Sequence, residues 1–553
     1  MKKITFLSAA IPLLVSYVAI HAADSGQATM LQKVEANKVA EVSLVSGKSY
    51  ENPFMEVELD AIFTEPDGTQ LRVPAFWAGG KRWCFRYSSA MPGMHRWRTE
   101  CSDKSNENLQ GAEGKIEVVP YHGDNPLYQH GLVRVAGDKR HFEQADGTPF
   151  IWLGDTWWKC MCKRMPWEGF QELTADRKAK GFSVVQIVCG GNYPDEVFES
   201  HWENEGGKPY ETKDFSVVNP AYFDYADRRI RCLVEAGISP AIVGAWGRPQ
   251  GGSPSPMSIV GVAGYERHWR YLIARYGAYP TVWIVGGEAS GPEWSEVTGY
   301  VRKTDPYHHM MTMHPPSPPN TARDSVTENL IDFDMLQTGH GDWTAAYTAI
   351  AKVKAGLMRK PPMPVLDGEV CYEGHMQTGL QDEQRYVFWG CMLSGAPGLT
   401  YGAAGIWQAS VEGDPGVYPI YDWTPWNVSM NYPGSTQMGL GKKLLEQYPW
   451  WRFQPHPEWV NPDCFAAGIP GEVRFIYQPK RNIYNWNGPL VKNLEPDVNW
   501  HVYYFDPVRG RKFDEGTIKA SAKAGDTTAK PIRYGHDVPS PQDWVMVLER
   551  VKG

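Results

Sequence analysis

The chain has 553 residues, and at roughly 150 residues per domain this length predicts about three to four domains. Hydrophobic residues make up 42% of the chain and charged residues 21%, which excludes a disordered or collagen-like protein. Lys and Arg number 55 against 63 Asp and Glu, a net charge of −8, so no nucleic-acid partner is expected. The chain is rich in aromatic residues, with 23 Trp, 28 Tyr and 19 Phe. Because flat rings pack on the apolar faces of sugars, a carbohydrate surface is the first idea to test.

The N-terminus has the order of a secretory signal peptide. Met1-Lys2-Lys3 is basic, residues 4–20 are almost entirely apolar, and His21-Ala22-Ala23 offers small residues for cleavage. We expect residues 1–23 to be removed near Ala22 or Ala23 and the mature protein to be secreted or periplasmic, with no membrane span. The alternative is an uncleaved anchor, but no basic stop-transfer cluster follows the apolar run.

The nine Cys favour buried thiols over a metal site. Cys84 and Cys101 flank a predicted hairpin, so a disulfide between them is one option. The chain has no CxxC pair and no His spacing typical of zinc ligands. We therefore expect no metal and no cofactor.

Residues 30–122 predict an N-terminal β-sandwich. Residues 55–63 alternate apolar and polar side chains, Pro66-Asp67-Gly68 is a turn, and residues 71–76 resume the strand pattern. Short strands at regular spacing, separated by such turns, are typical of sandwiches.

The C-terminal residues 454–553 predict a second β-sandwich. Residues 473–478, 501–505 and 544–548 are strand-like, and turns such as Asp506-Pro507 separate them.

Between these modules, residues 123–453 predict a (β/α)8 TIM barrel, so the expected fold class is α/β with flanking β-sandwich domains. The pattern is an apolar strand followed by a helix, repeated eight times; residues 222–236 and 265–276, for example, keep one helical face apolar. Strands that are apolar along their whole length are buried on both faces, as in a parallel sheet. The predicted strands are residues 150–157, 184–190, 240–246, 282–288, 310–314, 335–340, 365–369 and 399–402.

Two glutamates end strands on opposite sides of this predicted barrel. Glu288 ends the fourth strand and Glu369 the seventh, and barrel chemistry lies at the C-terminal ends of the strands. Cleavage of a glycosidic bond needs such a pair, one acid to protonate the leaving oxygen and one carboxylate to attack or to activate water. Carboxyls about 5–5.5 Å apart predict retention, and about 6.5–9.5 Å inversion. We predict that both are catalytic, against the alternative that each caps a helix or pairs with a loop.

Polar and aromatic residues at the other strand ends are expected to bind the sugar. Asp155 binds either a hydroxyl or a neighbouring Arg, and Glu373, further along its loop, is the rival nucleophile. A metal hydrolase built on Asp155, His314 and His340 lacks the spacing of metal ligands. The predicted substrate-binding residues are Asp155, Trp157, Gln186, Asn192, Trp246, His314, His340, Tyr401 and Trp407, and Trp158 is a further candidate stacking ring.

At these residues the chain resembles the apiosidase-like glycoside hydrolases, a barrel family related to the large retaining clan with acid and nucleophile on strands four and seven. The resemblance implies Glu288 as acid/base and Glu369 as nucleophile. The segment before the predicted barrel resembles the sandwich module that precedes such barrels. The segment after it resembles a C-terminal module labelled collagen-binding. The segments that carry the resemblance are residues 152–157, 275–279, 283–288, 364–369, 372–374, 400–402 and 406–407 in the barrel, and 52–54, 67–68, 503–507 and 543–548 in the flanks.

Two positions depart from the family's pattern. The clan usually places Asn before the acid, to hold the sugar 2-hydroxyl, and this chain has Gly287. Many apiosidase-like relatives have Asp where this chain has Glu288.

The expected function is a secreted, exo-acting glycosidase on side chains of plant or algal polysaccharide, with an oligo- or polysaccharide as partner. One alternative is a catalytically inactive barrel whose modules bind glycan or matrix. Another is a polysaccharide lyase, for which Arg248 is the candidate to meet a uronate.

Overall fold

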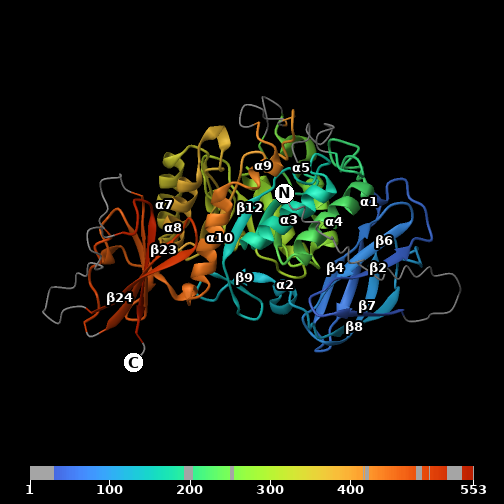
Figure 1. The fold of residues 1–553 in the computed structure, drawn as a ribbon. Helices are drawn as coiled ribbons and strands as arrows, with labels where there is room; N and C mark the ends of the chain where they lie inside the picture. Colours follow the sequence, from blue (N-terminus) through green and yellow to red (C-terminus); the bar gives the residue numbers. More distant parts are fainter. Residues whose placement is uncertain are drawn as a thin grey trace, which may run out of the picture.

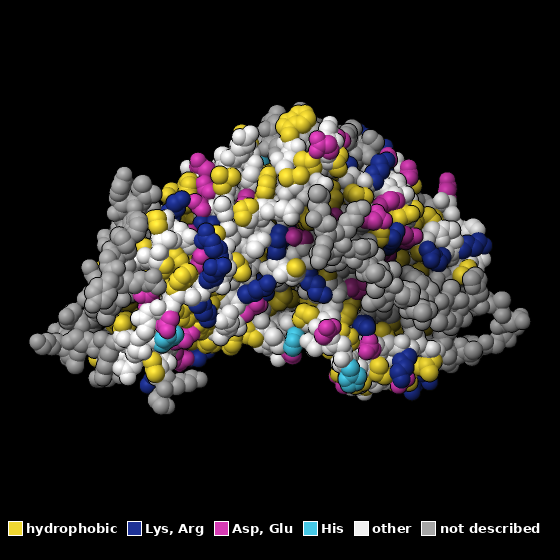
Figure 2. Space-filling view, in the orientation of Figure 1, with side chains coloured by type: hydrophobic (Ala, Val, Ile, Leu, Met, Phe, Trp, Pro, Cys, Tyr) yellow, Lys and Arg dark blue, Asp and Glu magenta, His cyan; other side chains and the backbone are white. Residues whose placement is uncertain are grey.

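The computed structural model describes residues 30–191, 203–248, 254–414, 416, 423–480, 488–496, 498–519 and 538–551. The chain forms an N-terminal β module, a central α/β part and a C-terminal β-sheet, and the two β parts lie on opposite sides of the central part (Figure 1). On the face seen in Figure 2, basic side chains lie among acidic ones. The predicted signal peptide, residues 1–23, lies outside the described residues. Within the described ranges, no helix is long and apolar enough to cross a membrane.

The N-terminal module consists of two sheets around one core. Alternation of buried and exposed residues, as in β2, turns one face of each strand inward. Phe63, Trp83, Phe85 and Trp97 fill the space between the sheets. The larger sheet has the order β1 (Met30–Glu35), β8 (Glu113–Val119), β7 (Gly93–Cys101), β3 (Leu59–Thr64), β4 (Gln70–Pro74), and the smaller has β2 (Ala40–Val45), β6 (Arg82–Tyr87), β5 (Phe76–Trp77).

The two cysteines considered for a disulfide lie in different sheets of this module. Cys84 is in β6 and Cys101 is in β7, and both are buried free thiols. Burial raises the pKa of the Cys84 thiol to about 11. The structure therefore does not contain the disulfide that the sequence left open.

Among the described residues, eight strands build the central part, parallel within each of its two sheets, and each of them is a strand that the sequence predicts. Six form one sheet in the order β16-β15-β14-β13-β12-β19, and β17 pairs with β18. Because β17 contacts β16 and β18 contacts β19, the strands follow one another around a ring. The α/β character is thus confirmed. The strands are β12 (Trp152–Thr156), β13 (Val184–Val188), β14 (Ser239–Val243), β15 (Val282–Gly287), β16 (Met311–His314), β17 (Asp334–Gly339), β18 (Val365–Val370) and β19 (Gly398–Tyr401).

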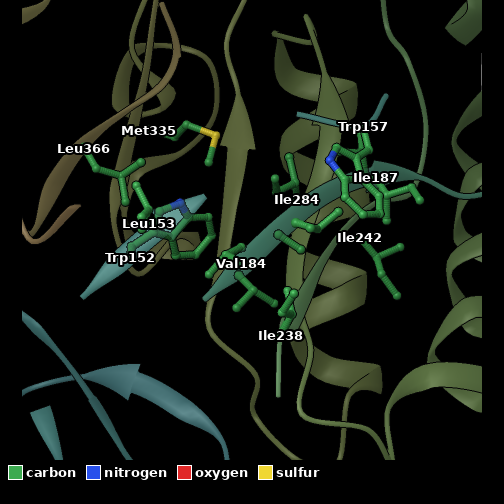
Figure 3. Packing of buried hydrophobic residues seen from close by; sticks show 14 of the residues in the cluster. Trp152, Leu153, Trp157, Val184, Ile187, Ile238, Ile242, Ile284, Met335 and Leu366 are labelled. Atoms are coloured by element: carbon green, nitrogen blue, oxygen red, sulfur yellow. The ribbon is translucent and has the colours of Figure 1, made fainter. Parts of the chain in front are cut away.

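The strands are buried on both faces, as their apolar sequences predict. Trp152, Leu153, Val184 and Ile284 are 0% exposed, and Figure 3 shows them in one region of packed hydrophobic side chains. Full burial of one such side chain contributes about 1.5–3 kcal/mol. A small sheet of β9 (Val133–Val135), β10 (Phe142–Gln144) and β11 (Pro149–Phe150) precedes the first of these strands.

One connection differs from the predicted repeat of eight helices. Among the described residues, β16 and β17 are joined by two 3₁₀ turns, Ala322–Asp324 and Glu328–Leu330, where a helix was expected. Pro315, Pro316, Pro318 and Pro319 follow β16, and proline has no N–H for a helical hydrogen bond. The other connections contain α3 (Trp167–Lys180), α4 (Pro220–Glu235), α5 (Pro256–Tyr276), α6 (Pro292–Thr304), α7 (Trp343–Leu357), α8 (Gln381–Met392), and α9 (Trp426–Ser429) with α10 (Pro433–Leu445); α1 (Pro53–Glu56) and α2 (Pro126–His130) are short helices nearer the N-terminus.

The C-terminal residues form one antiparallel sheet. Its side chains alternate between two cores: Phe475 and Val547 join the core of the central part, while Ile476 and Met546 join a separate cluster on the other face. Among the described residues this region contains one sheet, with the central part packed against one of its faces, so the two-sheet sandwich stays a prediction. The order of this sheet is β20 (Gln454–Pro455), β21 (Phe465–Ile469), β22 (Val473–Gln478), β25 (Trp544–Arg550), β23 (Asn499–Asp506), β24 (Arg511–Lys519).

Buried ion pairs hold both β parts against the central part. Arg86 of β6 donates to the Arg275 carbonyl at 2.7 Å and to Asp227 of α4 at 2.5 Å. On the other side, Arg385 of α8 donates two hydrogen bonds of 2.7 Å to Asp543. Both members of this second pair are almost fully buried. Loss of Arg385 therefore leaves the Asp543 carboxylate without its cation in the interior.

We expect Arg385→Met to destabilise the protein by about 3–5 kcal/mol, because it leaves the Asp543 carboxylate buried without its partner. The matched control is Arg452→Met, which removes a pair with Glu472 whose side chains are 51% and 48% exposed, and it should cost about 1 kcal/mol or less. Chemical unfolding followed by tryptophan fluorescence measures both. Equal shifts of the two midpoints would contradict the role given to the buried pair.

Candidate active site

The ends of four neighbouring strands bring the chemically active side chains together. Glu288 directly follows β15, His314 ends β16, Gln337 lies in β17 and Glu369 in β18. Across β15 and β16, Gly287 pairs with His314, and across β17 and β18, Gln337 pairs with Glu369. All four side chains thus belong to the same edge of the ring of strands.

Glu369 is held by two imidazoles. Its Oε1 accepts a hydrogen bond from Nε2 of His340 at 2.8 Å, and its Oε2 lies 2.7 Å from Nε2 of His314. The carboxylate is only 7% exposed. Burial by itself raises the pKa of Glu369, but the hydrogen bonds and charges of the two His outweigh it and hold the pKa well below its usual range. Glu369 is therefore ionised at neutral pH.

A second carboxyl supports Glu369 from within the same strand. Asp367 is fully buried; its Oδ1 accepts the N–H of Glu369 at 3.1 Å, and its Oδ2 lies 2.6 Å from the Thr338 hydroxyl. Burial, together with the nearby charge of Glu369, raises the pKa of Asp367 to about 8. At neutral pH Asp367 is mostly uncharged, so it supports the backbone under Glu369 without placing a second negative charge there.

Glu288 has a different environment at the outer edge. Its backbone has φ 45°, a left-handed conformation that costs about 1–3 kcal/mol for a residue other than glycine. Oε1 accepts a hydrogen bond from Nε2 of Gln337 at 3.1 Å and lies 3.4 Å from Nη1 of Arg248. Both of these contacts fall on Oε1 of Glu288.

Two residues, Gln337 and His314, each contact one glutamate and lie in register with the other glutamate or its neighbour. Gln337 bonds to Glu288 and stands opposite Glu369 in the strand register. His314 contacts Glu369 and stands opposite Gly287, the residue before Glu288. The structure thus brings the two predicted catalytic residues to one site.

Aromatic rings surround Glu369. Trp158 lies edge-on to His314, with ring centroids 5.2 Å apart, and its Nε1 donates to the Tyr372 hydroxyl at 2.9 Å. The ring of Trp246 is 5.7 Å from His314, and that of Trp407 is 6.4 Å from Tyr372. Of the predicted substrate-binding residues, the structure places four here: Trp246, His314, His340 and Trp407.

Asp155 and Trp157 are structural rather than substrate-facing. Both are 0% exposed. Asp155 Oδ2 accepts hydrogen bonds from Nε of Arg177 at 2.6 Å and from Nε1 of Trp157 at 2.7 Å. Of the two roles considered for Asp155, the structure shows the one that holds a neighbouring Arg. The prediction that these two residues contact a sugar is corrected.

Gln186 and Tyr401 require the same correction, since both are 0% exposed. Gln186 donates to the carbonyl of Gly368 at 2.9 Å, and Tyr401 donates to Glu373 at 2.7 Å. They support the strands beneath the site. Asn192, also predicted to bind substrate, lies outside the described residues.

The rival nucleophile, Glu373, is also part of the scaffold. It is 2% exposed; besides Tyr401, the N–H of Gly434 donates to its carboxylate at 3.0 Å. Burial raises the pKa of Glu373, in the direction opposite to that of Glu369. This environment favours Glu369 as the nucleophile.

Gln337 was not among the predicted site residues. The available signal was a polar side chain inside an apolar strand, but Gln186 carries the same signal and is structural. Among the described residues, no group of three or more His, Cys, Asp or Glu side chains is arranged to hold a metal ion.

Solved structures resemble this chain over most of its length. A glycoside hydrolase shares 21% identity and a TM-score of 0.64, covering 78% of this chain and 99% of that one. A glycoside hydrolase family 5 protein from Bacteroides vulgatus ATCC 8482 shares 20% identity and a TM-score of 0.65, covering 78% and 96%. Another structure from that organism, named as a proposed glycoside hydrolase, has 20% identity and a TM-score of 0.73, covering 94% and 100%. At these identities the likeness shows the fold.

Sequence families give a more specific result. Comparison with curated proteins yields no match. Residues 33–102 match a domain of unknown function, DUF5060, within the N-terminal module. Residues 136–452, more than half of the chain, match the family described as apiosidase-like, catalytic domain. The chain therefore belongs to the apiosidase-like family of glycoside hydrolases.

Proposed function

We propose that this protein is a secreted, retaining glycosidase that removes side-chain sugars from plant or algal polysaccharides, within a (β/α)8 barrel flanked by β modules. The observation that carries the proposal is the pair of unlike glutamates at one rim. Glu369 is held ionised by His314 and His340, whereas Glu288 lies at the outer edge with one oxygen left for a proton.

The reaction follows from these two environments. Glu369 attacks the anomeric carbon while Oε2 of Glu288 gives its proton to the leaving oxygen, so the glycosidic bond breaks and a glycosyl-enzyme ester forms. Glu288, now ionised, then removes a proton from water, and the hydroxyl displaces Glu369 from the sugar. The configuration at the anomeric carbon is inverted twice and thereby retained.

The substrate class rests on the aromatic rings and the family. Trp158 and Trp246 pack against His314, and Trp407 packs against Tyr372. Trp246, which is less buried than the other two, offers a flat apolar surface for a sugar ring. The matching family's description points to apiosides among side-chain sugars. A test panel therefore includes aryl apiosides, other aryl pentosides and hexosides in both anomeric forms, and pectic and algal oligosaccharides.

We expect Glu369→Ala and Glu369→Gln to lose turnover on every cleaved member of the panel, because no other group replaces the nucleophile. Glu288→Gln should lose roughly 10²–10⁴-fold on substrates with poor leaving groups and far less on dinitrophenyl glycosides, whose leaving group needs no proton. Steady-state hydrolysis measures both. Glu472→Gln, on the exposed surface of the C-terminal sheet, is the control with normal activity. Wild-type turnover in both Glu369 variants would refute the mechanism.

The product separates this chemistry from its rivals. Proton NMR during turnover should show the first product with the anomeric configuration of the substrate. A first product of opposite configuration would establish inversion, and an unsaturated, ultraviolet-absorbing product would establish a lyase.

We expect His340→Ala to move the acid limb of the kcat/KM profile to higher pH. The variant removes a donor that stabilises the ionised form, so the pKa of Glu369 rises toward its usual value and protonation inactivates the enzyme at higher pH. His340→Gln keeps an N–H donor and should shift the limb less. His141→Ala, in the β9–β10 turn, is the control. An acid limb unchanged in His340→Ala would show that this imidazole does not maintain the charge.

Secretion is proposed on the N-terminal sequence: a basic start, an apolar run and the small residues Ala22 and Ala23. Expression of the full chain in a bacterial host should give an exported protein whose N-terminus begins after Ala22 or Ala23. N-terminal sequencing checks this, and an intact Met1 on a membrane-bound product would support the anchor instead.

A further inference from the structure

Several buried polar atoms at the site have no hydrogen-bond partner among the described residues, and Oε1 of Gln337 is one of them. Gln337 is 5% exposed, and its Oε1 accepts no hydrogen bond from any described residue. An unpaired buried acceptor costs about 1–3 kcal/mol. A ligand that donates a hydrogen bond to Oε1 recovers this free energy on binding.

The neighbours of Gln337 fix which way its amide points. Nε2 donates to Oε1 of Glu288 at 3.1 Å, and a flipped amide would place two oxygens against each other. The backbone is also held: the N–H of Gln337 donates to the Asn320 carbonyl at 3.2 Å, and its own carbonyl accepts from Nδ2 of Asn320 at 2.8 Å. Oε1 is therefore a preset acceptor.

The residue before Glu288 is Gly287, which has no side chain that could accept a hydrogen bond from a ligand. A Cβ at Gly287 would lie 2.2 Å from Cε3 of Trp246, so the indole ring occupies the place of any side chain there. Gln337, by contrast, bonds to Glu288 and stands opposite Glu369 in the register. Its amide therefore lies against Glu288, on the strand next to the strand of Glu369.

We propose that Oε1 of Gln337 accepts a hydrogen bond from the hydroxyl next to the anomeric carbon, and that Gln337 thereby selects sugars with a 2-hydroxyl. The inference rests on the proposed function. Glu288 and Glu369 act on the two sides of the anomeric carbon, so a group between them faces that carbon's neighbours. These are the ring oxygen, which has no hydrogen to donate, and the carbon that bears the 2-hydroxyl, which has one.

The test compares the aryl glycosides that the enzyme cleaves with their 2-deoxy counterparts. In the wild type, kcat/KM should fall when the hydroxyl is removed, because Oε1 is again unpaired. In Gln337→Met, which has similar length but no amide, the ratio of kcat/KM for the parent to that for the 2-deoxy glycoside should drop by roughly 10–100-fold. Gln337→Asn shortens the side chain by one methylene and so moves the amide away; it should lower the same ratio. This variant replaces Gln337→Met in the test if the Met variant is insoluble.

Two comparisons separate this inference from other outcomes. Gln144→Met changes a buried Gln of β10, whose amide donates to Pro126, and should keep the wild-type ratio. A purely structural role for Gln337 would slow parent and deoxy substrates equally; an unchanged ratio overturns the inference. Glu369→Gln is assayed alongside. If it is inactive while the ratio stays unchanged, only the role of Gln337 fails; if it retains turnover, the proposed function fails with it.

Discussion

The constraint on which the rest of the site depends is a carboxylate kept charged in a nearly buried position. Removing a charge from water is costly unless it is paired and hydrogen-bonded. His314, at the end of β16, and His340, directly after β17, supply that pairing to Glu369. Asp367, fully buried two residues away, is mostly neutral at neutral pH and adds little repulsion. The strand register is what brings these four groups together, so the charge on Glu369 depends on the whole edge of the ring of strands.

Small residues make room for the rings around this charge. Trp246 lies over Gly287, and Tyr372 lies over Gly402, where an added Cβ would be 2.2 Å and 2.1 Å from the rings. The ring contacts then continue from Trp246 through His314 and from Tyr372 to His340. The same packing explains why the residue before Glu288 has no side chain. The amide of Gln337, on another strand, lies against Glu288 instead.

The fold was predictable where local pattern decides it, and the site only in part. Apolar runs identified all eight central strands, since burial on both faces leaves a clear pattern. The C-terminal sheet was harder, because strands covered by another domain have the same alternation as strands in a sandwich. Strand-end position pointed to Glu288 and Glu369, but it did not separate Trp246, which faces the site, from Trp157, which is buried beside Asp155. That difference depends on the direction in which each side chain leaves its strand end, and three-dimensional packing decides it.

The unlike environments of the two glutamates also support the role proposed for each. A group that must deliver a proton cannot be one whose ionised form is stabilised by two imidazoles, so Glu369 is unsuited to be the acid. Glu288 is 13% exposed, its two donors both contact Oε1, and its other oxygen remains for the proton that the leaving group needs. Reversing the roles would require the buried carboxylate to gain a proton against both His contacts. The asymmetry of burial and hydrogen bonding thus supports Glu369 as nucleophile and Glu288 as acid/base, independently of the family's pattern.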